Sequence, residues 1–127
     1  MQDFSAIYLV YLWVGAGVGA TGRWLLSEFF SKASQDIAAG TLLANLTGAF
    51  LIGLLFHLSQ TKGWSTEIRL AVLVGGLGSL TTFSTFSLEG WQLITENQWL
   101  WFIAHSLLHF LGCLLMVCFG TWVARMA

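Results

Sequence analysis

The 127-residue sequence contains no proline and little charge. Charged residues make up 9% of the chain, whereas ordinary globular domains carry about 25%. Hydrophobic residues make up 57%. This balance excludes an ordinary soluble domain and predicts an all-α integral membrane protein with a single domain, residues 1–127. Because the sequence has no basic cluster, nucleic acid is not an expected partner. Without proline, glycine must supply any break in a helix.

Cysteine is scarce as well, and catalytic motifs are missing. Cys113 and Cys118 are the two cysteines, and their five-residue spacing puts them on different helix faces, which excludes a disulfide within that helix. The sequence also lacks a nucleophile–base pair, a phosphate-binding loop and a convincing metal cluster. We therefore do not expect an enzyme.

Four runs without charged residues are long enough to cross about 30 Å of hydrocarbon, which takes about 20 residues. They are Phe4–Gly22, Ile37–Thr61, Leu70–Leu88 and Asn97–Ala124. We predict four transmembrane helices surrounded by lipid, at about 5–26, 38–59, 66–78 continued by 83–95, and 97–124.

Small residues recur at helical spacing in the first two spans. Gly15 and Gly19 form a GxxxG pattern, and Gly40, Ala44 and Gly48 recur every four positions. Such rows let a second helix approach closely. They predict close helix–helix contacts on both spans.

The centre of the third span, residues 75–87, is unlike a lipid-facing helix. It reads GGLGSLTTFSTFS, three glycines with a row of serines and threonines. Non-helical backbone at membrane depth survives only where protein, ion or water satisfies it. We expect the helix to stop near Gly78 and resume near Phe83, which suggests a path for an ion or solute.

The positive charges hardly favour either orientation in the membrane. With four spans, Lys62, Arg69 and Arg125 lie on one side, and Arg23 and Lys32 lie on the other. The positive-inside rule then selects no single orientation. We expect insertion both ways round and an antiparallel, dual-topology homodimer whose broken third helices meet at the membrane midplane.

Polar and aromatic residues in the second and third spans are candidates for the pore lining. Asn45 either makes an interhelical hydrogen bond or offers its NH₂ group to the pore, and Thr41 lies one turn earlier on the same face. Phe83 and Phe86 are three residues apart among hydroxyl groups. The positive edges of their rings suit a desolvated anion better than a cation. Ser84 and Thr85 are further candidates for this lining.

Gly78 and Thr81 bracket the expected break, which frees backbone carbonyls. A hard cation such as Na⁺, water or a neighbouring helix could satisfy them. Arg23 either anchors the end of the first helix at the interface or attracts anions in a vestibule. Glu89 is expected at a wet pore mouth, because a buried ionised carboxylate is costly.

His105 and His109 form an i,i+4 pair on the fourth span. This spacing can bind zinc, but the sequence offers no third ligand such as that of an HExxH motif. A polar stripe that faces the pore or a partner helix is the favoured interpretation.

Three stretches together resemble the CrcB/Fluc family of fluoride channels. They are GRWLL (Gly22–Leu26), GTLLANLTGAFLIG (Gly40–Gly53) and GSLTTFSTFSLE (Gly78–Glu89). The resemblance covers nearly the whole chain, including its length and its four-span layout.

The resemblance implies a dual-topology antiparallel homodimer in the cell (inner) membrane. Such a protein carries two fluoride pores and lets fluoride leave the cell passively, which lowers cytoplasmic fluoride. It further implies that Phe83, Phe86 and Asn45 line the pore. Gly78 and Thr81 would offer carbonyls to a central structural Na⁺, and Arg23 and Glu89 would lie near the pore entrances.

Two other functions remain open from the residues. The alternative transporter is a proton-coupled exporter of the small multidrug type, which needs an acidic residue in its first helix. Phe4–Gly22 has none, so only Glu89 could replace it. The other alternative is a membrane subunit that only scaffolds partners, and the polar centre of the third span argues against it.

Overall fold

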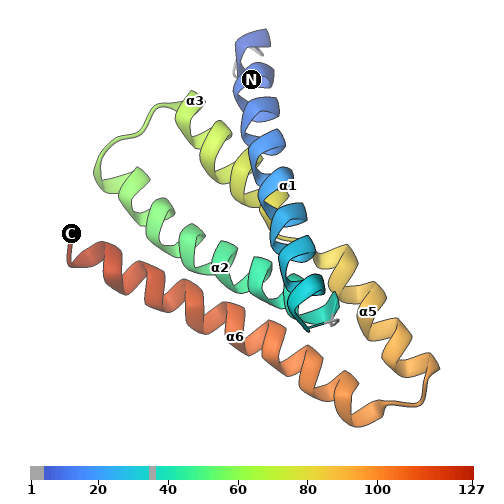
Figure 1. The fold of residues 1–127 in the computed structure, drawn as a ribbon. Coiled ribbons are helices and arrows are strands. Elements are labelled where there is room, and N and C mark those ends of the chain that lie inside the picture. Colours follow the sequence, from blue (N-terminus) through green and yellow to red (C-terminus); the bar gives the residue numbers. More distant parts are fainter. Residues whose placement is uncertain (1–4, 35–36) are drawn as a thin grey trace.

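The computed structural model describes residues 5–34 and 37–127, and every regular element among them is helical. Figure 1 shows these helices in chain order. They are α1 (Ala6–Ser34), α2 (Ile37–Thr61), α3 (Thr66–Arg69), the π-helical η1 (Leu70–Leu77), α4 (Gly78–Leu80), α5 (Phe83–Thr95) and α6 (Trp99–Arg125).

The first helix is longer than the sequence analysis predicts. It continues to Ser34 instead of ending near residue 26, so Arg23 lies inside α1 and not at its end. The residues from Arg23 to Ser34 include neither glycine nor proline, and glutamate and lysine are good helix formers. A charged residue ends an uncharged run but does not end a helix.

Glycines in α1 bring its backbone against η1. A Cβ on Gly15 would overlap the carbonyl oxygen of Ala71, and a Cβ on Gly19 would overlap that of Gly76. From the opposite side, a Cβ on Gly75 would clash with the backbone of α1 at Leu12. The predicted close contact through the GxxxG pattern is therefore confirmed, and its partner is η1.

The small residues of α2 also lie in contacts. Ala44 is fully buried, and Gly40 packs against Ser27, where an added Cβ would lie 2.9 Å from the Ser27 Cα. Gly48 faces the side chain of Thr81 so closely that a Cβ would overlap it. The row of small residues thus brings α2 close to α1 at one end and to the residue after α4 at the other.

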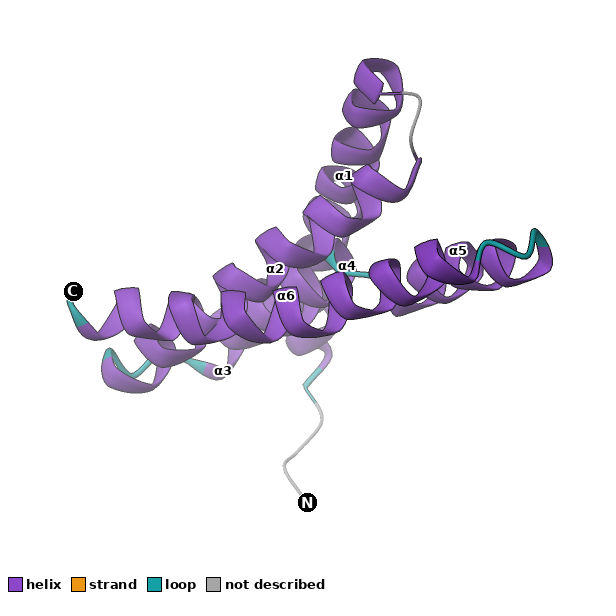
Figure 2. Ribbon diagram, turned by 90° about the horizontal axis from the view of Figure 1, so that it is seen from below, coloured by secondary structure: helices purple, strands orange, loops and turns teal. Residues whose placement is uncertain are grey.

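Glycines also allow α2 and α6 to lie side by side, as Figures 1 and 2 show. A Cβ on Gly53 of α2 would overlap the carbonyl oxygen of Val117, and a Cβ on Gly120 of α6 would overlap that of Phe50. The two helices run in the same direction, and α1 crosses them steeply.

Two extended residues separate α4 from α5. Thr81 has φ −83° and ψ 155°, and Thr82 has φ −148° and ψ 119°. Thr82 is the N-cap of α5, because its hydroxyl oxygen accepts a hydrogen bond from the Thr85 backbone N–H at 3.2 Å. The helical part before this point reaches Leu80, two residues beyond the predicted stop at Gly78.

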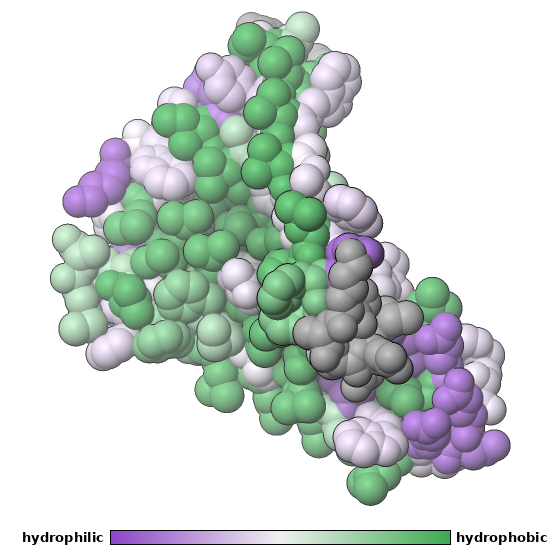
Figure 3. Space-filling view, viewed as in Figure 1, coloured by the Kyte–Doolittle hydropathy of each residue, from purple (hydrophilic) through white to green (hydrophobic). Residues whose placement is uncertain are grey.

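The described part of the chain is polar inside and apolar outside. Its buried apolar side chains are Ala44, Ala49, Leu77 and Ala124, whereas Thr41, Asn45, Ser59, Thr82, Glu89, His105 and His109 are its buried polar ones. Large apolar side chains such as Val18 and Leu100 are 70% and 79% exposed. In Figure 3 the hydrophobic surface covers the middle of the molecule, and hydrophilic surface gathers toward its ends. Lipid is the solvent that suits this arrangement.

Three helical stretches are long and apolar enough to cross a membrane: Ala39–Thr61, Thr66–Thr95 and Trp99–Arg125. They correspond to the second, third and fourth predicted spans. α1 is not among them, because glycine, tyrosine and tryptophan dilute its aliphatic residues and Arg23 lies within it. The structure is thus that of a multi-pass membrane protein with three apolar spans and a fourth long helix packed against them.

Candidate functional site

An open cavity of about 730 Å³ lies where α2, α5 and α6 meet the end of η1. Its lining is mostly apolar and includes five of the predicted pore and cation-site residues. These are Asn45, Gly78, Thr81, Phe83 and Phe86, and His109 and Cys113 line the same cavity from α6.

The side chain of Asn45 binds both backbone polar groups of Thr82. Thr82 N–H donates to Asn45 Oδ1 at 2.8 Å, and Asn45 Nδ2 donates to the Thr82 carbonyl oxygen at 3.0 Å. Asn45 and Thr82 are 8% and 7% exposed. The amide therefore replaces the hydrogen bonds that the extended backbone cannot make within a helix. Of the two interpretations of Asn45, the interhelical hydrogen bond is observed.

An amide nitrogen carries two hydrogens, and Thr82 accepts only one of those of Asn45. The second N–H is therefore compatible with a role in the pore lining. The same side chain can hold the extended backbone in place and still offer one donor to the cavity that it lines.

Hydroxyl groups cluster at the start of α5. The Thr82 Oγ1 lies 3.3 Å from Ser84 Oγ and 3.0 Å from Thr85 Oγ1. Ser84 is exposed and Thr85 is half-buried. The structure thus brings the two predicted hydroxyl residues to Thr82, the residue that Asn45 holds.

The rings of Phe83 and Phe86 lie side by side, with centroids 5.4 Å apart. Phe83 is 79% exposed, whereas Phe86 packs on α6. The Phe86 centroid lies 4.8 Å from that of the stacked His105 ring and 4.6 Å from that of His109. The three-residue spacing thus puts both phenylalanine rings on one face of α5, and two histidines of α6 support Phe86 there.

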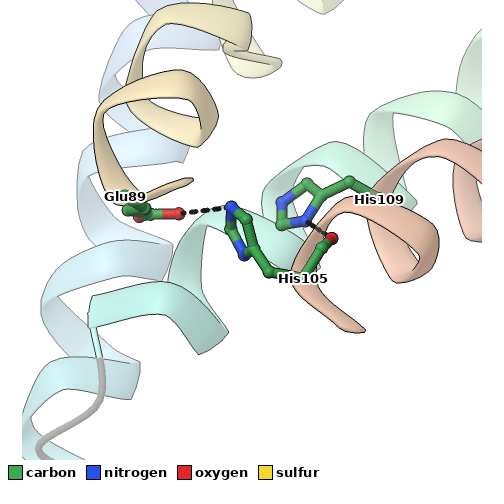
Figure 4. Close-up of side chains that lie close together, drawn as sticks. All are labelled: Glu89, His105 and His109. Carbon is green, nitrogen blue, oxygen red and sulfur yellow. Dashed lines mark hydrogen bonds and ion pairs between the residues drawn. The ribbon is translucent and has the colours of Figure 1, made fainter. Parts of the chain in front are cut away.

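Glu89 is buried among the described residues, 8% exposed, and its predicted position at a pore mouth stays a prediction. Thr41 Oγ1 donates a short hydrogen bond to Glu89 Oε1, and Glu89 Oε2 lies 3.8 Å from His105 Nε2. Figure 4 shows the carboxylate directed toward the histidines of α6. Thr41 on α2 and His105 on α6 thus provide polar contacts that offset the cost of burying the carboxylate.

The carbonyls of Gly78 and Thr81 lose the donors that a continuous helix would give them. Thr82 N–H, which would donate to Gly78, donates to Asn45 instead. Thr85 N–H, which would donate to Thr81, donates to the Thr82 hydroxyl. Both carbonyls are thereby available to another group, and both residues line the cavity.

Arg23 is half-buried on α1 and is not among the described residues that line the cavity. Its neighbour Gly22 faces the Leu80 side chain, where an added Cβ would lie 3.7 Å away. Arg23 is therefore near the end of α4 but separate from the site around Asn45.

The group that sequence reasoning missed is Glu89 with His105 and His109. The i,i+4 spacing identified the two histidines, but Glu89 reaches them only through the packing of α5 on α6. No local pattern could have supplied this contact.

The sequence of the chain is similar to those of known proteins. Residues 10–121 match the family model described as "CrcB-like protein, Camphor Resistance (CrcB)". A protein of Burkholderia thailandensis named "Fluoride-specific ion channel FluC" is 39% identical over 118 residues, which cover 92% of each chain. A protein of the same name from Haemophilus influenzae (strain PittGG) is 40% identical, again over 92% of each chain.

Proposed function

The chain belongs to the CrcB-like family, and we propose that it is a fluoride-specific ion channel that lets fluoride leave the cell passively. The observation that carries this proposal is the similarity to fluoride channels over 92% of the chain, a stretch long enough to include the cavity with Asn45, Phe83 and Phe86. The names of the relatives agree with the prediction that the chain is not an enzyme. They favour a channel over the proton-coupled exporter.

The cavity, together with the hydroxyl groups beside it at the start of α5, offers groups that could replace the water around fluoride. Fluoride is small and strongly hydrated, so a selective path must supply hydrogen-bond donors at close range. The second N–H of Asn45, the hydroxyls of Ser84 and Thr85, and the ring edges of Phe83 and Phe86 are such donors. A larger halide would fit this donor arrangement less well.

The functional unit in this proposal is an antiparallel homodimer of chains inserted in both orientations. The nearly balanced positive charges at the two ends support it. The open cavity and the 79% exposure of Phe83, which lines it, leave a surface that a second copy could cover. In this assembly α1 would serve as the fourth span, since its 29 residues rise about 43 Å, more than the hydrocarbon thickness.

A structural Na⁺ between the two copies belongs to the same proposal. The diverted donors of Gly78 and Thr81 support it, because the two carbonyls can then accept a hard cation. When bound, such an ion supplies positive charge that stabilises carbonyl dipoles directed at one point. Arg23, on α1 near the end of α4, is proposed to attract anions toward the pore from a vestibule.

Flux from liposomes tests the proposal directly. Purified protein is reconstituted into liposomes loaded with potassium fluoride or potassium chloride, and valinomycin is added so that potassium balances the charge. A halide electrode should record fluoride efflux far faster than chloride efflux. Equal fluxes of the two halides, or no fluoride efflux, would refute the proposed function. Uptake of a cationic dye driven by a proton gradient would instead support the exporter.

A further inference from the structure

Three metal-ligating side chains converge beside the cavity. Glu89 comes from α5, and His105 and His109 come from successive turns of α6 (Figure 4). One ligand atom from each residue can be chosen so that all three lie within 4.8 Å of one another. All three residues are buried, with exposures of 8%, 9% and 5%.

A hydrogen bond fixes the His109 ring in the tautomer that can bind a metal through Nε2. Its Nδ1 lies 3.0 Å from the carbonyl oxygen of His105, and since a carbonyl only accepts, Nδ1 carries the hydrogen. In neutral imidazole Nε2 is then an acceptor. This atom is buried and has no hydrogen-bond partner among the described residues. Metal-ligating histidines usually donate their other N–H to a carbonyl or carboxylate, as His109 does.

Glu89 and His105 complete the group. Thr41 donates to Glu89 Oε1, which anchors the carboxylate, while Oε2 lies 3.8 Å from His105 Nε2. His105 Nε2 also lies 3.1 Å from the carbonyl oxygen of Phe86, a contact that a metal ion would replace.

The donor set selects the class of metal. Two imidazoles and one carboxylate suit Zn²⁺ and similar transition ions, whereas Mg²⁺ and Ca²⁺ prefer oxygen ligands alone. Zn²⁺ with bonds of about 2.0–2.1 Å and tetrahedral geometry places its ligands about 3.3 Å apart. The observed separations of up to 4.8 Å therefore require the three groups to close by about 1.5 Å at most.

We propose that Glu89, His105 and His109 form a binding site for Zn²⁺ or a related transition-metal ion, and that metal bound there blocks the channel. The blocking part rests on the proposed function. Phe86 packs on both histidine rings, so ligation displaces its support. A divalent ion beside the cavity also holds fluoride instead of letting it pass.

Direct binding is measured on the purified full-length chain with Co²⁺ and then Zn²⁺. Bound Co²⁺ should give visible absorption bands that reach a plateau at one ion per chain, and Zn²⁺ should displace them. Glu89→Gln and His109→Gln should each weaken binding at least about tenfold, judged by the scale of metal-site mutations. Absence of these bands in the wild-type protein would overturn the site without reference to any variant.

His57→Gln is the matched control, because His57 lies on α2 outside the cluster and its loss should leave binding unchanged. Cys113→Ser tests the thiol one helical turn beyond His109, and binding should persist in this variant as well. Size-exclusion elution and helical circular dichroism equal to wild type show that a variant is folded. A folded His109→Gln protein that binds Co²⁺ like wild type overturns the site, as does loss of binding in Cys113→Ser.

Fluoride efflux then tests the block. Zn²⁺ should slow efflux from liposomes that contain the wild-type or His57→Gln protein, and EDTA should restore it. Metal bound with full stoichiometry but without any change in efflux would overturn the blocking role. A protein that binds metal and carries no fluoride would refute the proposed function and leave the site standing. Fluoride efflux by a protein that does not bind metal would support the proposed function and refute the metal site.

Discussion

Replacing Asn45 by alanine should strongly destabilise the protein, because one side chain satisfies two buried backbone groups. Asn45 accepts from Thr82 N–H at 2.8 Å and donates to the Thr82 carbonyl at 3.0 Å, and the substitution leaves both buried groups without these partners. An unsatisfied buried group costs about 1–3 kcal/mol, so the two together should cost about 2–6 kcal/mol of unfolding free energy. Hydrogen bonds measured inside a membrane protein average about 0.6 kcal/mol each, so two such bonds would cost about 1.2 kcal/mol if the freed groups found other partners.

The assay is equilibrium unfolding in mixed micelles with increasing sodium dodecyl sulfate, followed by tryptophan fluorescence and circular dichroism. Thr47→Val is the matched control, because Thr47 is an exposed residue of the same helix, two positions after Asn45. Its unfolding free energy should stay within about 0.5 kcal/mol of wild type, as is usual for surface changes. An Asn45→Ala protein that is as stable as Thr47→Val would show that the pairing with Thr82 does not stabilise the extended backbone.

Three further predictions concern the packing, the rings and the cation. Gly15→Ala should lose about 1–3 kcal/mol of stability because its Cβ meets the Ala71 carbonyl, whereas Gly17→Ala, with nothing within 4 Å of its Cβ, should change little in the same unfolding assay. Phe83→Leu and Phe86→Leu should each slow fluoride efflux at least about tenfold, equivalent to about 1.4 kcal/mol, and normal efflux from both would remove the rings from the mechanism. Replacing Na⁺ by N-methyl-D-glucamine should lower the melting temperature of the protein, and restored Na⁺ should recover it; an unchanged melting curve would count against the proposed structural Na⁺.

The parts of the fold that depend on local spacing could be predicted from the sequence. Gly15 and Gly19 identified a close contact, and the structure supplies its partner, η1. The stretch rich in serine and threonine is where the backbone becomes extended, at Thr81 and Thr82, because threonine caps helices well and β-branching favours extended backbone. The end of α1 differs from the prediction for a local reason too, since a polar stretch without glycine or proline, such as the one after Leu26, can continue a helix.

The candidate site could be predicted only in part, because its polar contacts join residues far apart in the chain. Asn45 bonds a residue 37 positions away, and Thr41 bonds one 48 positions away. The cost of a buried carboxylate argued for a wet Glu89. The sequence does not show that a hydroxyl group from α2 and an imidazole ring from α6 lie beside this carboxylate. Helical spacing predicts which residues share a face of one helix, but it does not predict which other helix packs against that face.

The proposed second copy is supported by polar backbone more than by apolar area. Lipid tails are as apolar as leucine, so exposed side chains such as Phe83 gain little from burial against protein. Carbonyls at membrane depth are different, because each one left unsatisfied in hydrocarbon costs several kcal/mol. The N–H groups that would donate to the Gly78 and Thr81 carbonyls in a continuous helix donate to the side chains of Asn45 and Thr82 instead. Gly78 and Thr81 both line the open cavity. Water, a cation or a partner chain must therefore reach this cavity. A copy inserted the other way round, with Na⁺ between the two interruptions, would satisfy both chains at one point.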